Sequence, residues 1–213
     1  MDAPSSSPLA SVALASLIAF VSGSLPFSLW MGRLIAKRDV RDVGDGNPGA
    51  TNALRAGGAA LGVTVLLLDV SKGVLPVVIA RDALGLDGWT LALVAVLPVV
   101  GAAFSPFLGF RGGKALAVTL GTWIGLTLWT VPLVAVVAIV VATFLMEPDG
   151  WAVAAALTAM LVGVVLWTPG GALVVALLLQ AVIILWKHRA DLVRPPRSRR
   201  VGSPPRRAAS GPR

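Results

Sequence analysis

The stretch that decides the fold is ALAVTLGTWIGLTLWTVPLVAVVAIVVATFLM, residues 115–146. It contains 32 residues without a single Asp, Glu, Lys or Arg. A helix that crosses a bilayer needs about 20 residues, so this run is too long for one span. Pro132, which follows Trp129 and Thr130, is the expected break, because proline interrupts a helix. The run therefore predicts two membrane helices, of which the first is short.

Further apolar runs lie on both sides of this one. They cover residues 9–31, 59–80, 89–108, 151–167 and 172–186. Each is about long enough for one span. Together with the two helices of 115–146, they predict an all-α integral membrane protein with about seven transmembrane helices. A re-entrant short segment would reduce that number to five or six.

The composition supports the same fold class. Hydrophobic residues make up 56% of the chain and charged residues 13%, against roughly 25% charged in an ordinary globular domain. The mean hydropathy of +0.86 excludes a soluble domain and a disordered chain. The chain has no Cys and one His, His188. This excludes a disulfide framework, a thiolate metal site and a multi-histidine zinc site, and we expect neither a metal nor a cofactor.

The positive charge alternates with the apolar runs. Of the 18 Lys and Arg residues, all but Lys72 and Arg81 lie in 32–56, 109–114 and 187–213. Basic loops between membrane spans stay on the cytoplasmic side. We therefore expect the N-terminus outside and the three basic stretches, with the C-terminus, in the cytoplasm. The distribution favours a lipid bilayer as partner and excludes a nucleic-acid-binding domain, whose basic residues would share one soluble face.

The domain organisation follows from these runs. We expect residues 1–194 to form a single polytopic membrane domain. Its first segment lacks a basic start and exceeds the length of a signal-peptide core, so it is interpreted as a retained helix. Residues 195–213 are rich in Pro, Arg and Ser. They are expected to be a disordered cytoplasmic tail attracted to anionic lipid.

Two glycine-rich segments are candidates for anion binding. The first is VGDGNPGATN, residues 43–52, followed by Arg55, and the second is FLGFRGGK, residues 107–114, just before a predicted helix. Glycines let backbone N–H groups approach an anion, arginine offers a bidentate fork, and a helix start favours negative charge. The candidate phosphate-binding residues in these segments are Asn47, Gly49, Thr51, Asn52, Arg55, Arg111, Gly112 and Gly113. Flexible basic loops that only orient the protein are the alternative.

Two further polar features interrupt the apolar pattern. WKHRAD, residues 186–191, ends the last run and contains His188, Arg189 and Asp191. It is either part of a site or only the end of a span. Asp69 and Lys72 lie three residues apart inside the second run, on one helix face. Ionisable groups in a membrane often mark function, but mutual neutralisation is the favoured interpretation here, giving a structural intramembrane pair.

These motifs, taken in order, resemble the bacterial acyl-phosphate:glycerol-3-phosphate acyltransferases. The resemblance covers about residues 20–194 and rests on SGSLPF (22–27), residues 44–52, LLLDVSKG (66–73), FSPF (104–107), residues 111–114, and His188 with Arg189. It implies a seven-helix enzyme of the bacterial cell membrane, with its active site on the cytoplasmic side. The implied reaction, part of phospholipid biosynthesis, moves an acyl group from acyl phosphate to the 1-hydroxyl of glycerol 3-phosphate, giving lysophosphatidic acid and phosphate.

The chain's own chemistry agrees with this resemblance. Acyl phosphate is already activated, so positioning and charge neutralisation suffice and no covalent nucleophile is required. We expect Lys114, His188, Asp45 and Asp191 to be the catalytic residues, and Arg189 to join the phosphate-binding set. The sequence gives no indication of the oligomeric state.

The resemblance fails at three positions. Asp45 stands where the family has Ser, Ala102 where it has His, and Asp191 where it has Asn. The two carboxylates would repel substrate phosphates, unless they bind Mg²⁺ together with phosphate, one of them is protonated, or Asp45 serves as a general base. Otherwise the protein is a divergent paralogue with another acceptor or no activity. A small membrane transporter is a further alternative, but the charges crowd one interface instead of crossing the midplane.

Overall fold

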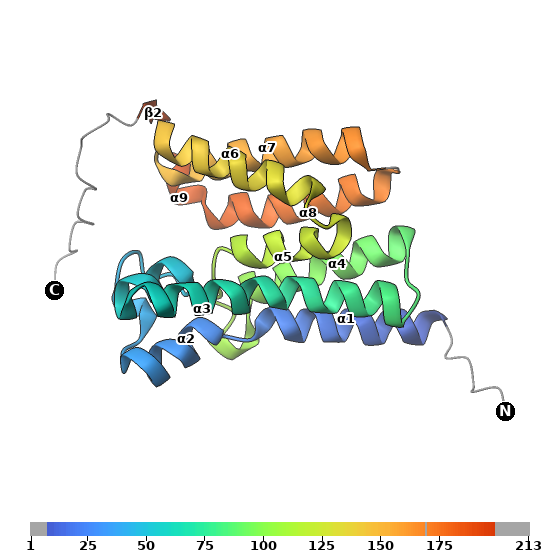
Figure 1. The fold of residues 1–213 in the computed structure, drawn as a ribbon, viewed down its shortest axis with the longest axis horizontal. Helices are drawn as coiled ribbons and strands as arrows, with labels where there is room; N and C mark the ends of the chain where they lie inside the picture. The colour runs from blue at the N-terminus through green and yellow to red at the C-terminus, as the bar shows by residue number, and fades with distance from the viewer. Residues whose placement is uncertain (1–7, 169, 199–213) are drawn as a thin grey trace.

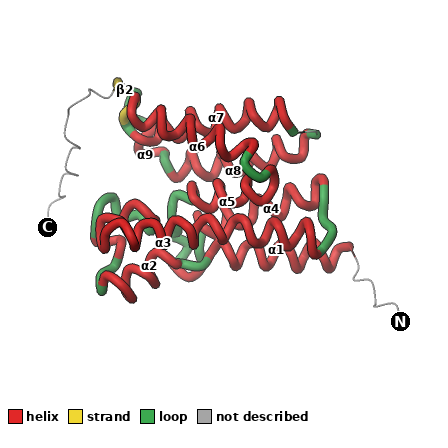
Figure 2. The backbone as a smooth tube through the Cα atoms, viewed as in Figure 1, coloured by secondary structure: helices red, strands yellow, loops and turns green. Residues whose placement is uncertain are grey.

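The computed structural model describes residues 8–168 and 170–198. Their regular secondary structure is helical, apart from one antiparallel pair of two-residue strands, β1 (Met146–Glu147) and β2 (Arg197–Ser198), and loops connect the elements (Figure 2). The helices are α1 (Pro8–Ser24), α2 (Phe27–Met31), α3 (Ala50–Val78), α4 (Gly88–Ala103), α5 (Leu116–Thr127), α6 (Thr130–Leu145), α7 (Asp149–Trp167), α8 (Gly171–Lys187) and α9 (Arg189–Leu192).

Four helical stretches of the described residues are long and apolar enough to cross a membrane. They are Pro8–Ala36, Ala50–Ala83, Gly88–Leu108 and Asp149–Trp167. Three shorter apolar helices, α5, α6 and α8, accompany them. Figure 1 shows α1, α3, α4 and α5 in one half of the bundle and α6, α7 and α8 in the other. The all-helical prediction is confirmed.

The helix boundaries differ from the sequence prediction at three places. The first run is broken at Leu25–Pro26, and helical structure continues to Ala36. The second helix begins at Ala50 instead of residue 59, with non-helical backbone at Gly57 and Gly58. The chain breaks at Leu128–Trp129, before Pro132, which lies in the first turn of α6. Proline is tolerated there, because N–H groups of the first turn have no helical acceptor.

Of the predicted tail, residues 195–198 are described and 199–213 lie outside the described residues. Arg197 and Ser198 pair with the segment between α6 and α7. The indole Nε1 of Trp151 donates to the carbonyl of Arg194 at 2.8 Å. These two contacts hold the end of the described chain beside the start of α7.

Small residues bring the helix backbones together. A Cβ added to Gly73 on α3 would meet the carbonyl of Val118, and one added to Gly121 on α5 would meet the carbonyl of Val70. Gly23 and Gly101 have the same relation across α1 and α4, with the carbonyls of Pro98 and Phe20. Membrane helices associate through such small-residue contacts, because lipid supplies no hydrophobic driving force between them.

Gly121→Ala should therefore destabilise the protein. The added methyl would meet a backbone carbonyl of α3 that cannot rotate away, which costs roughly 1–3 kcal/mol for an overpacked site. The measurement is the thermal unfolding midpoint of purified protein in detergent. Gly171→Ala is the matched control, since a Cβ at Gly171 meets nothing within 4 Å. Equal midpoints for the two variants would contradict this account of the α3–α5 contact.

Candidate active site

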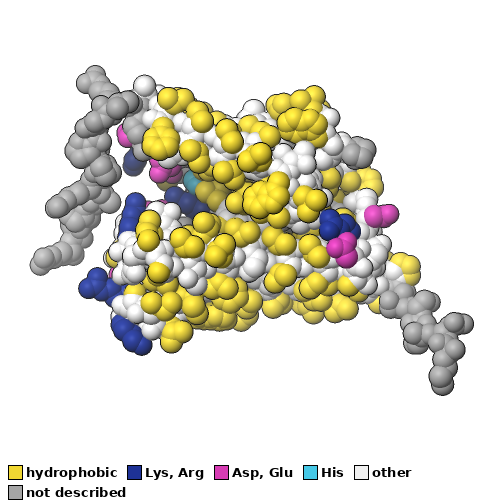
Figure 3. Space-filling view, in the orientation of Figure 1, with side chains coloured by type: hydrophobic (Ala, Val, Ile, Leu, Met, Phe, Trp, Pro, Cys, Tyr) yellow, Lys and Arg dark blue, Asp and Glu magenta, His cyan; other side chains and the backbone are white. Residues whose placement is uncertain are grey.

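One cavity of about 1910 Å³ lies between the two halves of the bundle. Its walls come from the α1–α2 break, the segment 44–55, α5, α6, α7 and the end of α8. Figure 3 shows its opening at one end of the molecule, with Lys and Arg, acidic side chains and the histidine inside. We call this opening, which is lined by Arg55, Lys114 and His188, the mouth. The volume exceeds the roughly 300–1,000 Å³ of common small-ligand pockets, so the cavity has room for a long ligand.

The first glycine-rich segment folds around Asp45. Its Oδ1 accepts from the backbone N of Asn47 at 3.1 Å and from Nδ2 of Asn52 at 2.9 Å. Arg55 donates to Oδ1 of Asn52 at 3.1 Å. Gly44 has a φ of +64°, and a Cβ there would meet the side chains of Arg55 and Asn52. Glycine is therefore required at 44 for both its backbone conformation and this close approach.

Lys114 lies between the two carboxylates that depart from the family pattern. Its Nζ is 3.0 Å from Oδ2 of Asp45 and 3.9 Å from Oδ2 of Asp191. Partial burial raises the pKa of Asp45, but the hydrogen bonds from Lys114 and the Asn47 amide outweigh it, so this pKa lies below its ordinary value. Lys114 thus joins three segments that are distant in sequence.

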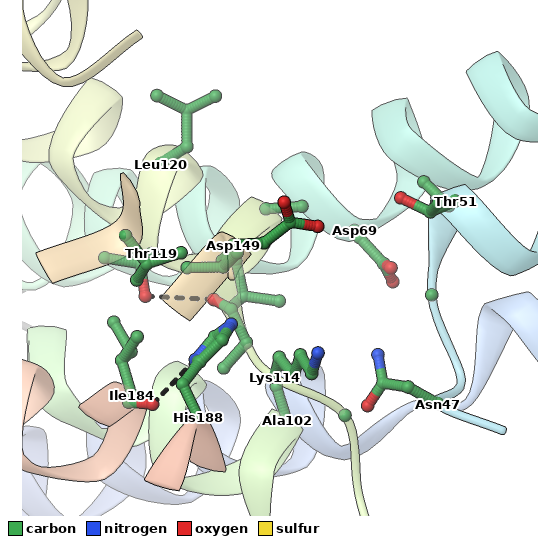
Figure 4. A pocket seen from close by; sticks show the side chains of 18 of the residues that line it. Asn47, Thr51, Asp69, Ala102, Lys114, Thr119, Leu120, Asp149, Ile184 and His188 are labelled. Atoms are coloured by element: carbon green, nitrogen blue, oxygen red, sulfur yellow. Dashed lines mark hydrogen bonds between the residues drawn. The ribbon is translucent and has the colours of Figure 1, made fainter. Parts of the chain in front are cut away.

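His188 is buried at the end of α8, with 3% of its surface exposed. Its Nδ1 is 2.8 Å from the carbonyl of Ile184, to which it donates in the neutral form, and this leaves Nε2 for the cavity. Burial lowers the pKa of His188 below its ordinary value. Figure 4 shows the polar ends of Asn47, Thr51, Asp69 and Lys114 directed into one open space, with His188 on the other side of Lys114.

The structure brings most of the predicted site residues together. The predicted residues that line the cavity are Asp45, Asn47, Gly49, Thr51, Asn52, Arg55, Gly113, Lys114, His188 and Asp191. Ala102, at the family's histidine position, lies in the same wall.

Three predicted phosphate-binding residues do not line it: Arg111, Gly112 and Arg189. Arg111 is exposed. Gly112 accepts a hydrogen bond from Lys187 at 2.9 Å through its carbonyl, and Arg189 lies 4.4 Å from the centre of the Trp186 ring.

The Asp69–Lys72 pair also lines the cavity. Lys72 Nζ is 2.7 Å from Oδ1 of Asp69 and donates to the carbonyl of Leu25 at 2.9 Å. Leu25 lies in the break between α1 and α2, where a carbonyl has lost its helical donor. The ammonium therefore neutralises the carboxylate and also stabilises the break. These contacts support a structural role.

Several cavity residues were missed by sequence reasoning. They are hydroxyls within apolar runs and charges beyond the motifs: Ser28, Thr119, Thr143, Asp149, Arg194 and Arg197. Arg197 belongs to the described cavity lining because β1 and β2 place the segment after α9 beside the start of α7, where Asp149 lies. Among the described residues, no three His, Cys, Asp or Glu side chains are grouped as a metal site would require.

The fold and this cavity define a helical membrane protein with a charged cavity at one end. A sequence profile described as "Glycerol-3-phosphate acyltransferase" matches residues 13–196. The chain belongs to the glycerol-3-phosphate acyltransferase family. It is therefore an integral membrane acyltransferase of phospholipid synthesis, and the family activity is the acylation of glycerol 3-phosphate.

Individual relatives agree. The glycerol-3-phosphate acyltransferase of Pseudomonas paraeruginosa is 37% identical over 179 residues, covering 84% of this chain and 93% of that one. The Anaeromyxobacter dehalogenans enzyme is 48% identical over 106 residues, covering 48% of this chain and 52% of that protein. The crystal structure of PlsY, an integral membrane glycerol 3-phosphate acyltransferase, in its glycerol 3-phosphate form has a TM-score of 0.76 and 29% identity, covering 86% of this chain and 91% of that one. Its lysophosphatidic acid form has a TM-score of 0.77.

The buried histidine predicts a pH-dependent stability. The pKa of His188 is lower in the folded state than the roughly 6.5 of an unfolded chain. As pH falls through that value the unfolded state takes up a proton first, so stability is lost toward the lower folded pKa. We expect the thermal midpoint to fall as the pH is lowered through about 6.5. The decline should be shallower in His188→Gln, and parallel curves for the two proteins would exclude His188 as the cause.

Proposed function

We propose that this enzyme takes its acyl group from an acyl phosphate and transfers it to the 1-hydroxyl of glycerol 3-phosphate, giving lysophosphatidic acid and phosphate. One observation carries the proposal: a single cavity joins a charged mouth to an apolar wall. The mouth contains Arg55, Lys114 and His188, and the wall is formed by α5, α6 and α7. Phosphate groups suit the first part and an acyl chain suits the second.

The charged mouth can support the reaction without a covalent intermediate. The glycerol hydroxyl attacks the acyl carbon, a new C–O bond forms, and the bond to the donor phosphate breaks. The departing phosphate accepts the hydroxyl proton. Lys114 and Arg55 neutralise the negative charge of the phosphates, and neutral His188 presents Nε2 to the reacting groups. Holding the reactants in contact and compensating their charge are together sufficient for an activated donor.

Asp45 and Asp191 compete with substrate in this mechanism. Each carboxylate lies within 4.0 Å of the Lys114 ammonium, in the position an anionic substrate group would take. We propose that phosphate displaces at least one of them on binding. A low pKa keeps Asp45 ionised at neutral pH, so protonation does not relieve this competition.

We also propose the membrane arrangement. Arg55, Lys114 and His188 line the mouth, and the starts of α3 and α5 and the end of α8 lie at this end of the bundle (Figure 1), which supports a cytoplasmic mouth in a bacterial cell membrane. Seven spans with the N-terminus outside and the C-terminus inside agree with this placement. The single membrane domain over residues 1–194 stays a prediction.

Lys114→Ala should lower turnover by about 10²–10³-fold, the usual effect of removing one preorganised charge-stabilising group. The assay is phosphate release from palmitoyl phosphate with glycerol 3-phosphate and purified protein. Arg38→Ala, which removes an exposed arginine away from the cavity, is the control. Full turnover in Lys114→Ala would limit this residue to a role in topology. Transport of phosphate without acyl transfer would indicate a transporter.

The double variant Asp45→Ser with Asp191→Asn should raise kcat/KM for glycerol 3-phosphate. Each removed carboxylate frees Lys114 for phosphate, and like charges about 4 Å apart repel by roughly 4 kcal/mol at an effective dielectric of about 20. Steady-state kinetics with and without Mg²⁺ test this. Lower activity coupled to a lost Mg²⁺ requirement would instead make the carboxylates metal ligands. Lower activity with a lost pH dependence would make Asp45 a general base.

A further inference from the structure

The apolar part of the cavity has a closed end. On each of four helices, one residue is the deepest that lines the cavity: Leu120 on α5, Ala135 on α6, Met160 on α7 and Ile184 on α8. About one helical turn further from the mouth, each helix places a residue with 0% of its surface exposed. These four residues are Trp123, Val131, Val164 and Gln180, and we call them the floor. None of them lines the cavity.

The floor is held by hydrogen bonds as well as by packing. Trp123 donates from Nε1 to Oε1 of Gln180 at 2.8 Å, and Gln180 donates from Nε2 to the carbonyl of Ala95 at 2.9 Å. Both side chains are fully buried, so breaking this chain would leave polar groups unpaired in an apolar interior. Trp123, Val131 and Val164 belong to one core cluster that also contains Ala135 and Met160. The indole is therefore fixed in one position.

The depth of the apolar part can be read along α7. This helix lines the cavity from Asp149 at the mouth to Met160, which at about 1.5 Å per residue is a depth of about 16 Å. The apolar walls and the charged mouth are continuous, so the cavity suits a ligand with a phosphate at one end and a hydrocarbon chain at the other. A closed end limits how long that chain can be.

We propose that the floor sets the maximum acyl-chain length of the donor, with Gln180 positioning Trp123. The inference rests on the proposed function, in which the donor's chain occupies the apolar part of the cavity. A rigid floor discriminates sharply, because a single methylene in a fixed apolar pocket changes specificity by roughly 10–200-fold. The floor residues do not touch the reacting groups, so they should change which donor is used and leave the chemistry intact.

The test is the length profile of saturated acyl phosphates from lauroyl to stearoyl. Val164→Ala deepens the cavity without touching the hydrogen bonds, and Trp123→Phe shortens the floor side chain. Both should raise the stearoyl-to-palmitoyl ratio of kcat/KM about 10-fold, and Gln180→Met should raise it by freeing the indole. Ala135→Leu should lower the ratio by a similar factor. Val137→Leu, on the exposed face of α6, is the matched control and should leave it unchanged.

The outcomes separate the two proposals. The same chain-length profile of kcat/KM in all variants would overturn the proposed role of the floor. An equal loss of kcat/KM for every donor would also overturn it, because a merely structural role produces that result. The same donors are also measured as ligands by thermal stabilisation. If the wild-type protein binds these donors in a length-dependent way but releases no phosphate, the proposed donor is wrong. A shifted binding profile in Val164→Ala and Ala135→Leu would then still support the floor as the limit on chain length. An unshifted binding profile overturns it.

Discussion

The need to pair every backbone N–H and C=O group inside hydrocarbon governs this structure. A regular helix pairs most of these groups, but at helix ends and breaks some carbonyls have no N–H donor from their own helix. The two basic residues outside the three basic stretches both serve such carbonyls. Lys72 donates to Leu25 in the α1–α2 break, and Arg81 donates to Gly125 near the end of α5 at 2.7 Å. Charges that look misplaced in the sequence are therefore hydrogen-bond donors that permit irregular backbone in the membrane.

The exclusion of unpaired polar groups from hydrocarbon also shapes the candidate active site. The mouth gathers charge where water can reach it, and the helices beyond it offer only apolar walls. Lys114 is the central group, because loop 43–49, loop 109–115 and α9 all meet at its ammonium. Asp45 and Asp191 give that ammonium partners before substrate arrives. In the proposed mechanism, phosphate therefore exchanges with a carboxylate at Lys114 instead of filling an empty positive site.

The sequence predicted the fold class and most of the mouth, and the reasons are physical. The uncharged run of residues 115–146 is incompatible with a soluble domain. The three-residue spacing of Asp69 and Lys72 places both side chains on one helix face. Arg111 and Arg189 were assigned to the site because their type and position suited it, but the rotation of a loop or of a helix end depends on packing. Trp186 does not line the cavity, and Arg189 packs on the Trp186 ring. The floor residues could not be predicted from the sequence, because nothing distinguishes a buried Val or Trp from the other apolar residues of the same run.

The shortness of α5 and α6 has a consequence for the surrounding lipid. With 12 and 16 residues they rise about 18 and 24 Å, less than the roughly 30 Å of a typical hydrocarbon core. Their connection at Leu128 and Trp129 is exposed, and tryptophan prefers the headgroup level. A bilayer meets such a mismatch by thinning locally or by drawing in headgroups. We therefore expect the bilayer to be thinner beside α5 and α6, so that a change in bilayer thickness acts first on this hairpin.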